Sequence, residues 1–159
     1  MNVLEHAAPQ WNRYSCGPAA LRCALLCYGT RVDGRRLARL ASTDPIEGTN
    51  EDGIKAAAAE FDLKIRIEVV QYAAVAQERL RQNLEDGKPV LLCVDSWSHW
   101  LCCLPRSKGV HLTARHVWVA DPARDGDEVV KRSTWRQLLR RAQWGLPDEA
   151  RWDLFILEP

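Results

Sequence analysis

The chain of 159 residues has no long hydrophobic run and no excess of charge of one sign. No apolar segment approaches the roughly 18 to 20 residues of a membrane-spanning helix, so no transmembrane segment is predicted. Its 22 Lys and Arg residues nearly balance its 21 Asp and Glu residues, which disfavours a general nucleic-acid-binding protein. Near the amino terminus, Glu5 and His6 interrupt the apolar core that a signal peptide needs. We therefore expect a cytoplasmic protein with no nucleic-acid partner.

The sequence also lacks Cys-X-X-Cys pairs and cysteine–histidine spacings typical of zinc sites. We therefore expect no metal and no other cofactor. Disulfides are not expected either, because a cytoplasmic chain keeps its thiols reduced. Five of the six cysteines lie in apolar stretches and are predicted to be small buried side chains. They are Cys23, Cys27, Cys93, Cys102 and Cys103.

Neither repeats nor a linker interrupt the chain, so we expect a single domain over residues 1–159. Helices are predicted first and strands mostly later. The expected helices cover residues 16–28, 34–41, 53–61, 72–85 and 133–143. The expected strands cover residues 63–70, 89–94, 99–104, 116–121, 128–131 and 152–157. This order predicts an α+β fold, with a helical first half packed on an antiparallel sheet from the second half.

The remaining cysteine, Cys16, differs from the others because it follows a polar loop and opens a helix. The free N–H groups and the dipole at a helix N-terminus favour a thiolate. Gly17 follows directly and permits close approach of the backbone to a substrate. Cys16 is therefore a candidate nucleophile, whereas a further buried structural cysteine is the plainer interpretation.

A thiol nucleophile needs a base, and His99 and His116 are the two strand-borne candidates. A catalytic histidine also needs an acceptor, and Asp121 ends the strand that begins at His116. His116 and Asp121 would point to opposite faces of that strand. A hairpin turning near residue 110 instead places His99 opposite Asp121 on one face, which favours this pair. His6 and His111 are expected to be ordinary polar surface residues.

Donors for an oxyanion hole and walls for a substrate cleft are also present near these positions. Gln10 lies six residues before Cys16, and Asn12 is an alternative amide donor. Tryptophan is enriched, with seven residues against two Phe and three Tyr. Trp11, Trp97 and Trp100 flank Gln10 and His99 and are candidates for a substrate-binding surface. Packing in the core is the alternative for each indole, and Asp95 is expected to bound a turn.

These segments resemble the bacteriocin-processing, double-glycine leader cysteine peptidases of the papain-like superfamily. The matching segments are QWNRYSCGPAALRCALLCYG, GTNEDGIKAAAAEFDLKIRI, GKPVLLCVDSWSHWLCCL and VWVADP. The resemblance implies a papain-like fold with Gln10 as oxyanion donor, Cys16 as nucleophile, His99 as base and Asp121 as orienting acid. The segment between His99 and Asp121 is several residues longer than is usual in the family. Family members are often fused to transporter segments, whereas this sequence predicts a stand-alone peptidase domain.

The expected function is therefore cleavage of a peptide or protein through an acyl-enzyme on Cys16, with a leader peptide ending in Gly-Gly as one possible substrate. The same site is compatible with isopeptide cleavage of a ubiquitin-like tail or with transamidation, because these reactions differ only in what attacks the acyl-enzyme. A third alternative is an inactive peptidase-like module that only binds peptides. Such a module is expected to lose its Cys or His, and both are present here.

Overall fold

The computed structural model describes residues 3–159, and these residues form helices on both sides of one sheet. The helices are α1 (Val3–His6), α2 (Cys16–Cys27), α3 (Gly34–Leu40), α4 (Glu51–Ala59), α5 (Ala73–Glu85) and α6 (Trp135–Ala142). The strands are β1 (Lys64–Val70), β2 (Val90–Val94), β3 (His99–Cys103), β4 (His116–Ala120), β5 (Val130–Thr134) and β6 (Trp152–Glu158). Two short 3₁₀ helices, η1 (Gly126–Glu128) and η2 (Pro147–Glu149), lie in the late connections.

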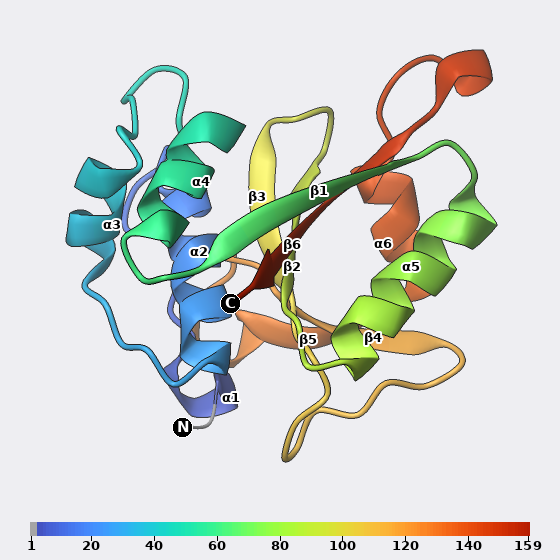
Figure 1. Cartoon of the computed structure of the whole chain (residues 1–159), viewed down its shortest axis with the longest axis horizontal. Helices are drawn as coiled ribbons and strands as arrows, with labels where there is room; N and C mark the ends of the chain where they lie inside the picture. The colour runs from blue at the N-terminus through green and yellow to red at the C-terminus, as the bar shows by residue number, and fades with distance from the viewer. Residues whose placement is uncertain (1–2) are drawn as a thin grey trace.

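The six strands form a single sheet in the order β1-β6-β2-β3-β4-β5, and every neighbouring pair is antiparallel. Figure 1 shows α2, α3 and α4 on one side of the sheet and α5 and α6 on the other. The predicted α+β class and the packing of amino-terminal helices on an antiparallel sheet are confirmed. The sheet is covered on its second face as well, because α5 and α6 return to it from the later part of the chain.

Strand β2 shows why both faces must be covered, since all five of its residues are buried. Leu91 and Cys93 join the core beneath α2, whereas Val90, Leu92 and Val94 join the core beneath α5 and α6. Alternate side chains of a strand point to opposite faces, so a continuous apolar run requires an apolar partner on each side.

The connection into α6 differs from the prediction of a strand over residues 128–131. Glu128 ends η1, and β5 begins later and continues to Thr134. The Thr134 hydroxyl accepts a hydrogen bond from the Gln137 N–H, while the Gln137 side chain accepts one from the Thr134 N–H. This capping box fixes the start of α6 directly after β5.

The register between β3 and β4 also differs from the expected one. Cys102 pairs with Ala120 and Cys103 with Val119, which is two residues away from a pairing of His99 with Asp121. A turn does lie near residue 110, where Ser107 bridges to Val110, but further residues on the β4 side shift the pairing. A shift of two residues preserves the face to which side chains point, whereas a shift of one would reverse it.

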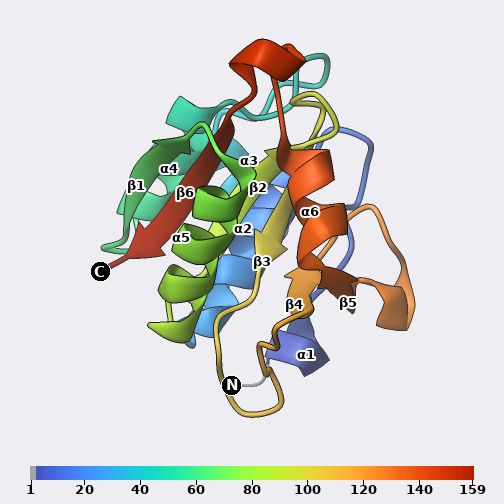
Figure 2. The ribbon, with the colours of Figure 1, turned by 90° about the vertical axis from the view of Figure 1, so that its right-hand side faces the viewer.

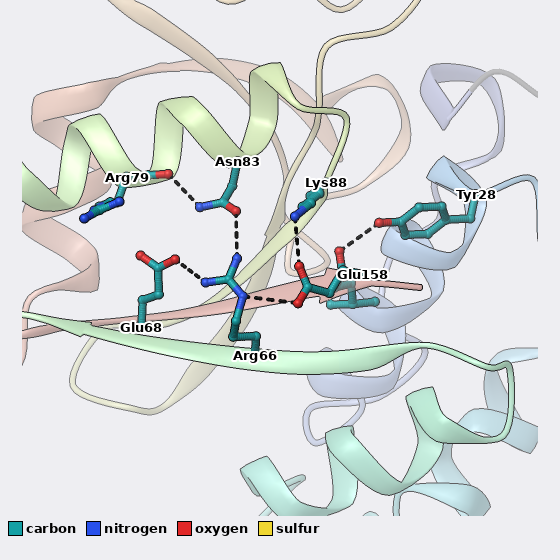
Figure 3. Close-up of polar contacts among 8 residues, drawn as sticks. Tyr28, Arg66, Glu68, Arg79, Asn83, Lys88 and Glu158 are labelled. Atoms are coloured by element: carbon teal, nitrogen blue, oxygen red, sulfur yellow. Dashed lines mark hydrogen bonds and ion pairs between the residues drawn. The ribbon is translucent and has the colours of Figure 1, made fainter.

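A polar network joins the neighbouring strands β1 and β6 to α5 (Figure 3). Arg66 of β1 bonds to Glu68, to Glu158 of β6 and to the Asn83 amide of α5. The Lys88 ammonium donates to the second Glu158 oxygen. The Tyr28 hydroxyl, just after α2, donates to the Leu157 carbonyl at 2.8 Å. These contacts connect the segment after α2 on one side of the sheet, and α5 on the other, to strands β1 and β6. Among residues 3–159, no helix combines the length and the apolar character needed to span a bilayer.

Candidate active site

The loop before α2 is organised by Ser15, which is fully buried. Its hydroxyl accepts hydrogen bonds from the backbone N–H groups of Trp11 and Asn12 and donates to the Asn12 carbonyl. Ser15 occupies the N-cap position of α2, yet its side chain makes no capping bond to the helix. A hydroxyl turned toward the loop leaves the N–H groups of the first turn of α2 available to Cys16 and to a ligand.

The close approach that Gly17 permits is to the protein itself. A Cβ at this position would lie 2.8 Å from Cβ of Thr49 and 3.3 Å from Cδ1 of Ile54. The Thr49 carbonyl in turn accepts the indole N–H of Trp100 at 2.8 Å. Gly17 therefore lets the start of α2 pack tightly against the segment before α4, which fixes the position of Cys16.

Cys16 is 6% exposed, and the pKa of its thiol is lowered from the usual value for cysteine. Burial acts in the opposite direction, but hydrogen bonds from His99 and from the backbone N–H groups of Trp100 and Gly17 outweigh it. The imidazolium charge adds to this effect. The thiolate form is therefore more favoured at Cys16 than at an ordinary cysteine.

His99 lies between Cys16 and Asp121. Its Nε2 is 2.6 Å from Oδ1 of Asp121, which leaves Nδ1 as the nitrogen available to Cys16. Burial works against protonation of the ring, but hydrogen bonds to Asp121 and Cys16, together with their charges, raise the pKa of His99 to about 9. The sheet brings the two residues together despite the shifted register, because they remain on one face.

Asp121 is 1% exposed and ionised, although burial opposes its charge. Hydrogen bonds from His99, the Ala123 N–H and Arg141 keep the pKa of its carboxyl well below the usual range. Arg141 Nη1 lies 3.2 Å from Oδ2, so each carboxylate oxygen has a donor. His116, the alternative histidine, lies elsewhere and pairs with Thr134 across β4 and β5.

Arg141, at the end of α6, was not predicted from the sequence as a site residue. Its guanidinium binds both oxygens of Asp95, at 3.0 and 2.7 Å, as well as Asp121. Its carbonyl accepts the Asp95 N–H at 2.9 Å. The sequence-level signal was weak, because basic residues in the last turn of a helix are common.

The segment that Arg141 holds is the turn joining β2 to β3. Asp95, Ser96 and Trp97 all have left-handed backbones, with φ of 55°, 58° and 64°. Non-glycine residues adopt this conformation at an energetic cost of about 1 kcal/mol or more each. Asp95 does bound a turn, as expected. His99, the first residue of β3, follows two residues after the last left-handed residue of this turn, Trp97. The ion pair with Arg141 offsets part of the strain.

Gln10 lies in the loop before Cys16, and its N–H donates to the Pro122 carbonyl at 2.8 Å, next to Asp121. Its side-chain Nε2 donates one hydrogen to the Asn12 carbonyl at 2.9 Å, which leaves the second hydrogen of that amide. Its Oε1 is buried without a hydrogen-bond partner among the described residues. The Asn12 Oδ1 accepts from the Tyr14 N–H within the loop, so this alternative amide serves the loop itself.

The three tryptophans are placed differently. Trp100 is only 4% exposed and belongs to the core, which supports the alternative interpretation for this residue. Trp97 is 36% exposed and makes edge contacts with Trp100, Trp144 and Phe155. Trp11 is partly exposed and lies against Gly34, where an added Cβ would meet its ring at 2.5 Å. Trp11 and Trp97 thus retain surface that a substrate can contact.

The other cysteines contrast with Cys16. Cys23, Cys93, Cys102 and Cys103 are buried as predicted, whereas Cys27 is only partly buried. Burial raises the pKa of all five, to about 11 for Cys23 and about 12 for Cys27 and Cys93. All six are free thiols. Within residues 3–159, no group of three His, Cys, Asp or Glu side chains is arranged to hold a metal ion.

This geometry agrees with the comparison with known families. The model of the Peptidase_C39 like family matches residues 6–145. The chain belongs to that family. It is a papain-like cysteine peptidase, and the resemblance identified from the sequence is confirmed. No curated protein sequence matches the chain.

Several solved structures have a similar fold. The peptidase domain of Streptococcus ComA, a bifunctional ABC transporter involved in quorum sensing, is 19% identical with a TM-score of 0.63, and 96% of each chain is covered. A double-glycine-motif protease from an AMS/PCAT transporter, solved in complex with its leader peptide, is 15% identical with a TM-score of 0.68, covering 96% of this peptidase and 90% of that chain. A putative C39-like peptidase from Bacillus anthracis is 10% identical with a TM-score of 0.60, covering 93% and 92%.

Proposed function

We propose that this peptidase cleaves its substrate through an acyl-enzyme on Cys16, with His99 as general acid and base and Asp121 as orienting acid. The observation that carries the proposal is a continuous line of contacts: His99 is hydrogen-bonded to Cys16, and its Nε2 lies 2.6 Å from Oδ1 of Asp121. The directions of two pKa shifts agree with this arrangement. The pKa of the Cys16 thiol is lowered, while that of His99 is raised to about 9. A thiolate–imidazolium pair is the reactive form of a papain-like site.

In the first half of the reaction, the Cys16 thiolate attacks the scissile carbonyl and forms a tetrahedral intermediate. The His99 imidazolium then gives its proton to the leaving amine, the C–N bond breaks, and a thioester remains on Cys16. In the second half, neutral His99 takes a proton from water as the water attacks the thioester. Release of the carboxylic acid product restores the thiolate and the imidazolium.

The negative oxygen of each intermediate needs donors. We assign this role to the backbone N–H of Cys16 and the side-chain amide of Gln10. Two observations support the assignment: the Ser15 hydroxyl does not cap α2, and Gln10 Nε2 uses only one of its hydrogens in the loop. A preorganised donor of this kind contributes about 10²- to 10³-fold to the rate. Trp11 and Trp97 are the proposed contact surfaces for substrate.

The proposed substrate is a leader peptide, cleaved after a Gly-Gly pair. Support comes from the similarity of fold to the double-glycine-motif protease bound to its leader peptide, over 96% of this chain. We further propose that one domain spanning the chain carries the reaction, because Cys16 from the start of α2 meets His99 and Asp121 from the sheet. The proposed compartment is the cytoplasm, where Cys16 and the other free thiols stay reduced.

The proposal is tested with a synthetic peptide containing one Gly-Gly pair between an amphipathic leader and a short cargo. Mass spectrometry should find cleavage after the second glycine by the wild-type protein and none by Cys16→Ala. Cys93→Ala is the matched control, because that buried thiol lies near Cys16 yet has a raised pKa, and this variant should still cleave. A peptide with Ala-Ala in place of Gly-Gly tests specificity. Equal cleavage of both peptides would contradict the proposed specificity for Gly-Gly. Cleavage by Cys16→Ala would contradict the assignment of Cys16 as the nucleophile.

A further inference from the structure

A basic groove of about 760 Å³ lies beside the catalytic site, between β5, α6 and the loop after β4. In Figure 2 these three segments lie next to one another on the side of the molecule that faces the viewer. Six of the residues that line the groove are cationic: Arg124, Lys131, Arg132, Arg136, Arg140 and Arg141. No aspartate or glutamate is among the lining residues, so the groove is positive along its length.

Most of this charge is not compensated by the protein. Only Arg141 forms an ion pair; the other five cationic side chains have no carboxylate within 4.0 Å in the described part of the chain. The chain as a whole carries a net charge of only +1, so this concentration of cations is local. Like charges gathered in a concave surface repel one another and raise the local concentration of anions.

The groove connects directly to the catalytic acid. Arg141 lines the groove and also donates to Oδ2 of Asp121. Arg124, at the same end, donates its backbone N–H to the Asp121 carbonyl at 3.1 Å. A ligand that contacts Arg141 in the groove is therefore separated from Asp121 by the Arg141 side chain alone.

The shape of the groove suits an extended peptide. Strand β5 ends the sheet, so one of its edges has no neighbouring strand among residues 3–159. The four consecutive residues 131–134 line the groove, which therefore follows this edge of β5. An outer strand can pair with an added peptide strand, while flanking side chains read the sequence. None of the lining residues is aromatic, so the groove offers no surface on which nucleic-acid bases could stack.

We propose that this groove binds a carboxylate-rich segment of the peptide substrate, on the same molecule as the bond that Cys16 cleaves. The inference rests on the proposed peptidase function and extends it by naming a substrate class. Glutamate and aspartate side chains in the bound segment pair with Arg132, Arg136 and Arg140, while the scissile bond lies at Cys16.

Binding is measured first, separately from cleavage. The probe is a fluorescein-labelled peptide of eight glutamates, titrated by fluorescence polarisation with the Cys16→Ala protein. The groove variant is Arg132→Gln/Arg136→Gln/Arg140→Gln, added to Cys16→Ala. Its affinity for the probe should fall about tenfold, the effect expected from the loss of three partly exposed ion pairs. Binding to the unchanged groove should weaken as salt is raised.

The matched control is Arg35→Gln/Arg39→Gln/Arg106→Gln, which removes the same charge from exposed positions outside the groove. It should retain the affinity of the unchanged groove. Equal losses in the two triple variants would show attraction by net charge alone and would overturn the proposal. So would absence of probe binding, or tighter binding of a labelled single-stranded oligothymidine of the same length, which would point to a nucleic-acid site.

Cleavage is measured second, with two Gly-Gly peptides that differ only in four glutamates replaced by glutamines. The wild-type protein should prefer the acidic peptide, mainly through a lower KM, and the groove variant with Cys16 intact should lose that preference. An unchanged preference in the groove variant would overturn the proposal. If neither peptide is cleaved while the glutamate probe still binds through the groove, the leader-peptide function fails and the anion site stands.

Discussion

The two halves of the proposed catalytic site are built in different ways. The nucleophile half comes from one short segment, in which hydrogen bonds of Ser15 and Asn12 join residues only two to four positions apart. The imidazole half joins His99 to Asp121, 22 residues away, and Asp121 to Arg141, 20 residues further. A local loop can be recognised from its sequence, whereas a pair across a sheet depends on register and on a helix from the other layer.

The largest expected effect comes from the contact between the two halves. His99→Ala should lower kcat/KM by about 10⁴-fold, because it removes the general acid and base together. In the proposed mechanism, activity of the wild-type protein requires ionised Cys16 and protonated His99. It should fall as pH rises through about 9, where His99 loses its proton, and as pH falls below the lowered pKa of Cys16.

The same variant tests whether His99 activates the thiol. Iodoacetamide should alkylate wild-type Cys16 well below the free thiol pKa of about 8.5. In His99→Ala the midpoint should rise, since the hydrogen bond and the positive charge are gone while the helix remains. His116→Ala, on the neighbouring strand β4, is the control and should keep the wild-type profile. An unchanged midpoint in His99→Ala would mean that the helix alone activates Cys16.

Asp121→Asn should have the next largest effect and acts only on the imidazole half. Both carboxylate oxygens accept hydrogen bonds, Oδ1 from His99 and Oδ2 from Arg141. An asparagine has one oxygen, so its NH₂ group must face one of these donors. We expect a loss of about 10³-fold in kcat and an alkaline limb below 9, because the charge that raises the pKa of His99 is removed. Asp125→Asn, in the exposed loop after β4, should leave both unchanged.

The nucleophile half of the site could be predicted from the sequence more directly than the imidazole half. Cys16 was identified from its place at a helix start, and the helix begins there. The His99–Asp121 contact was predicted from a register that was wrong by two residues, and it forms because the error preserved the face. Arg141 was not predicted, because the sequence around it is that of an ordinary basic helix. Nothing in that segment indicates that this side chain contacts Asp95 and Asp121 and not solvent. Such contacts depend on how α6 packs against the sheet, and the local sequence pattern of α6 does not determine that packing.

Gln10→Ala should have a smaller effect, confined to the nucleophile half. Loss of one oxyanion donor lowers kcat by about 10²-fold. The alkaline limb should stay near 9, because no hydrogen bond joins Gln10 to His99 in the described part of the chain. Gln10→Glu preserves the shape but replaces the amide donor with a carboxylate, so it should lose at least as much. Gln71→Ala, at an exposed position outside the site, is the control. Full activity in Gln10→Glu would contradict the assignment.

The smallest effect is expected from Arg141→Met, which weakens the hydrogen bonding of Asp121 without removing a group that a neutral peptide is expected to contact. We expect kcat to fall about fivefold with little change in KM for a neutral peptide. The side chain is partly exposed, so loss of its ion pairs is worth only about 1 kcal/mol. Arg81→Met is the control, because in the described part of the chain that arginine pairs with Glu78 and Glu85 on the exposed surface of α5.

Asp95→Asn separates the two contacts of Arg141. It weakens the pair that holds the strained β2–β3 turn but leaves the hydrogen bond to Asp121. If Arg141 acts on the orienting acid, Asp95→Asn should lose clearly less activity than Arg141→Met, and Arg141→Lys should restore part of kcat through its remaining charge. Equal losses in Asp95→Asn and Arg141→Met would instead assign the effect to the turn. His99 would then be positioned by the strained backbone before it, and the role of α6 at the site would be to restrain that turn.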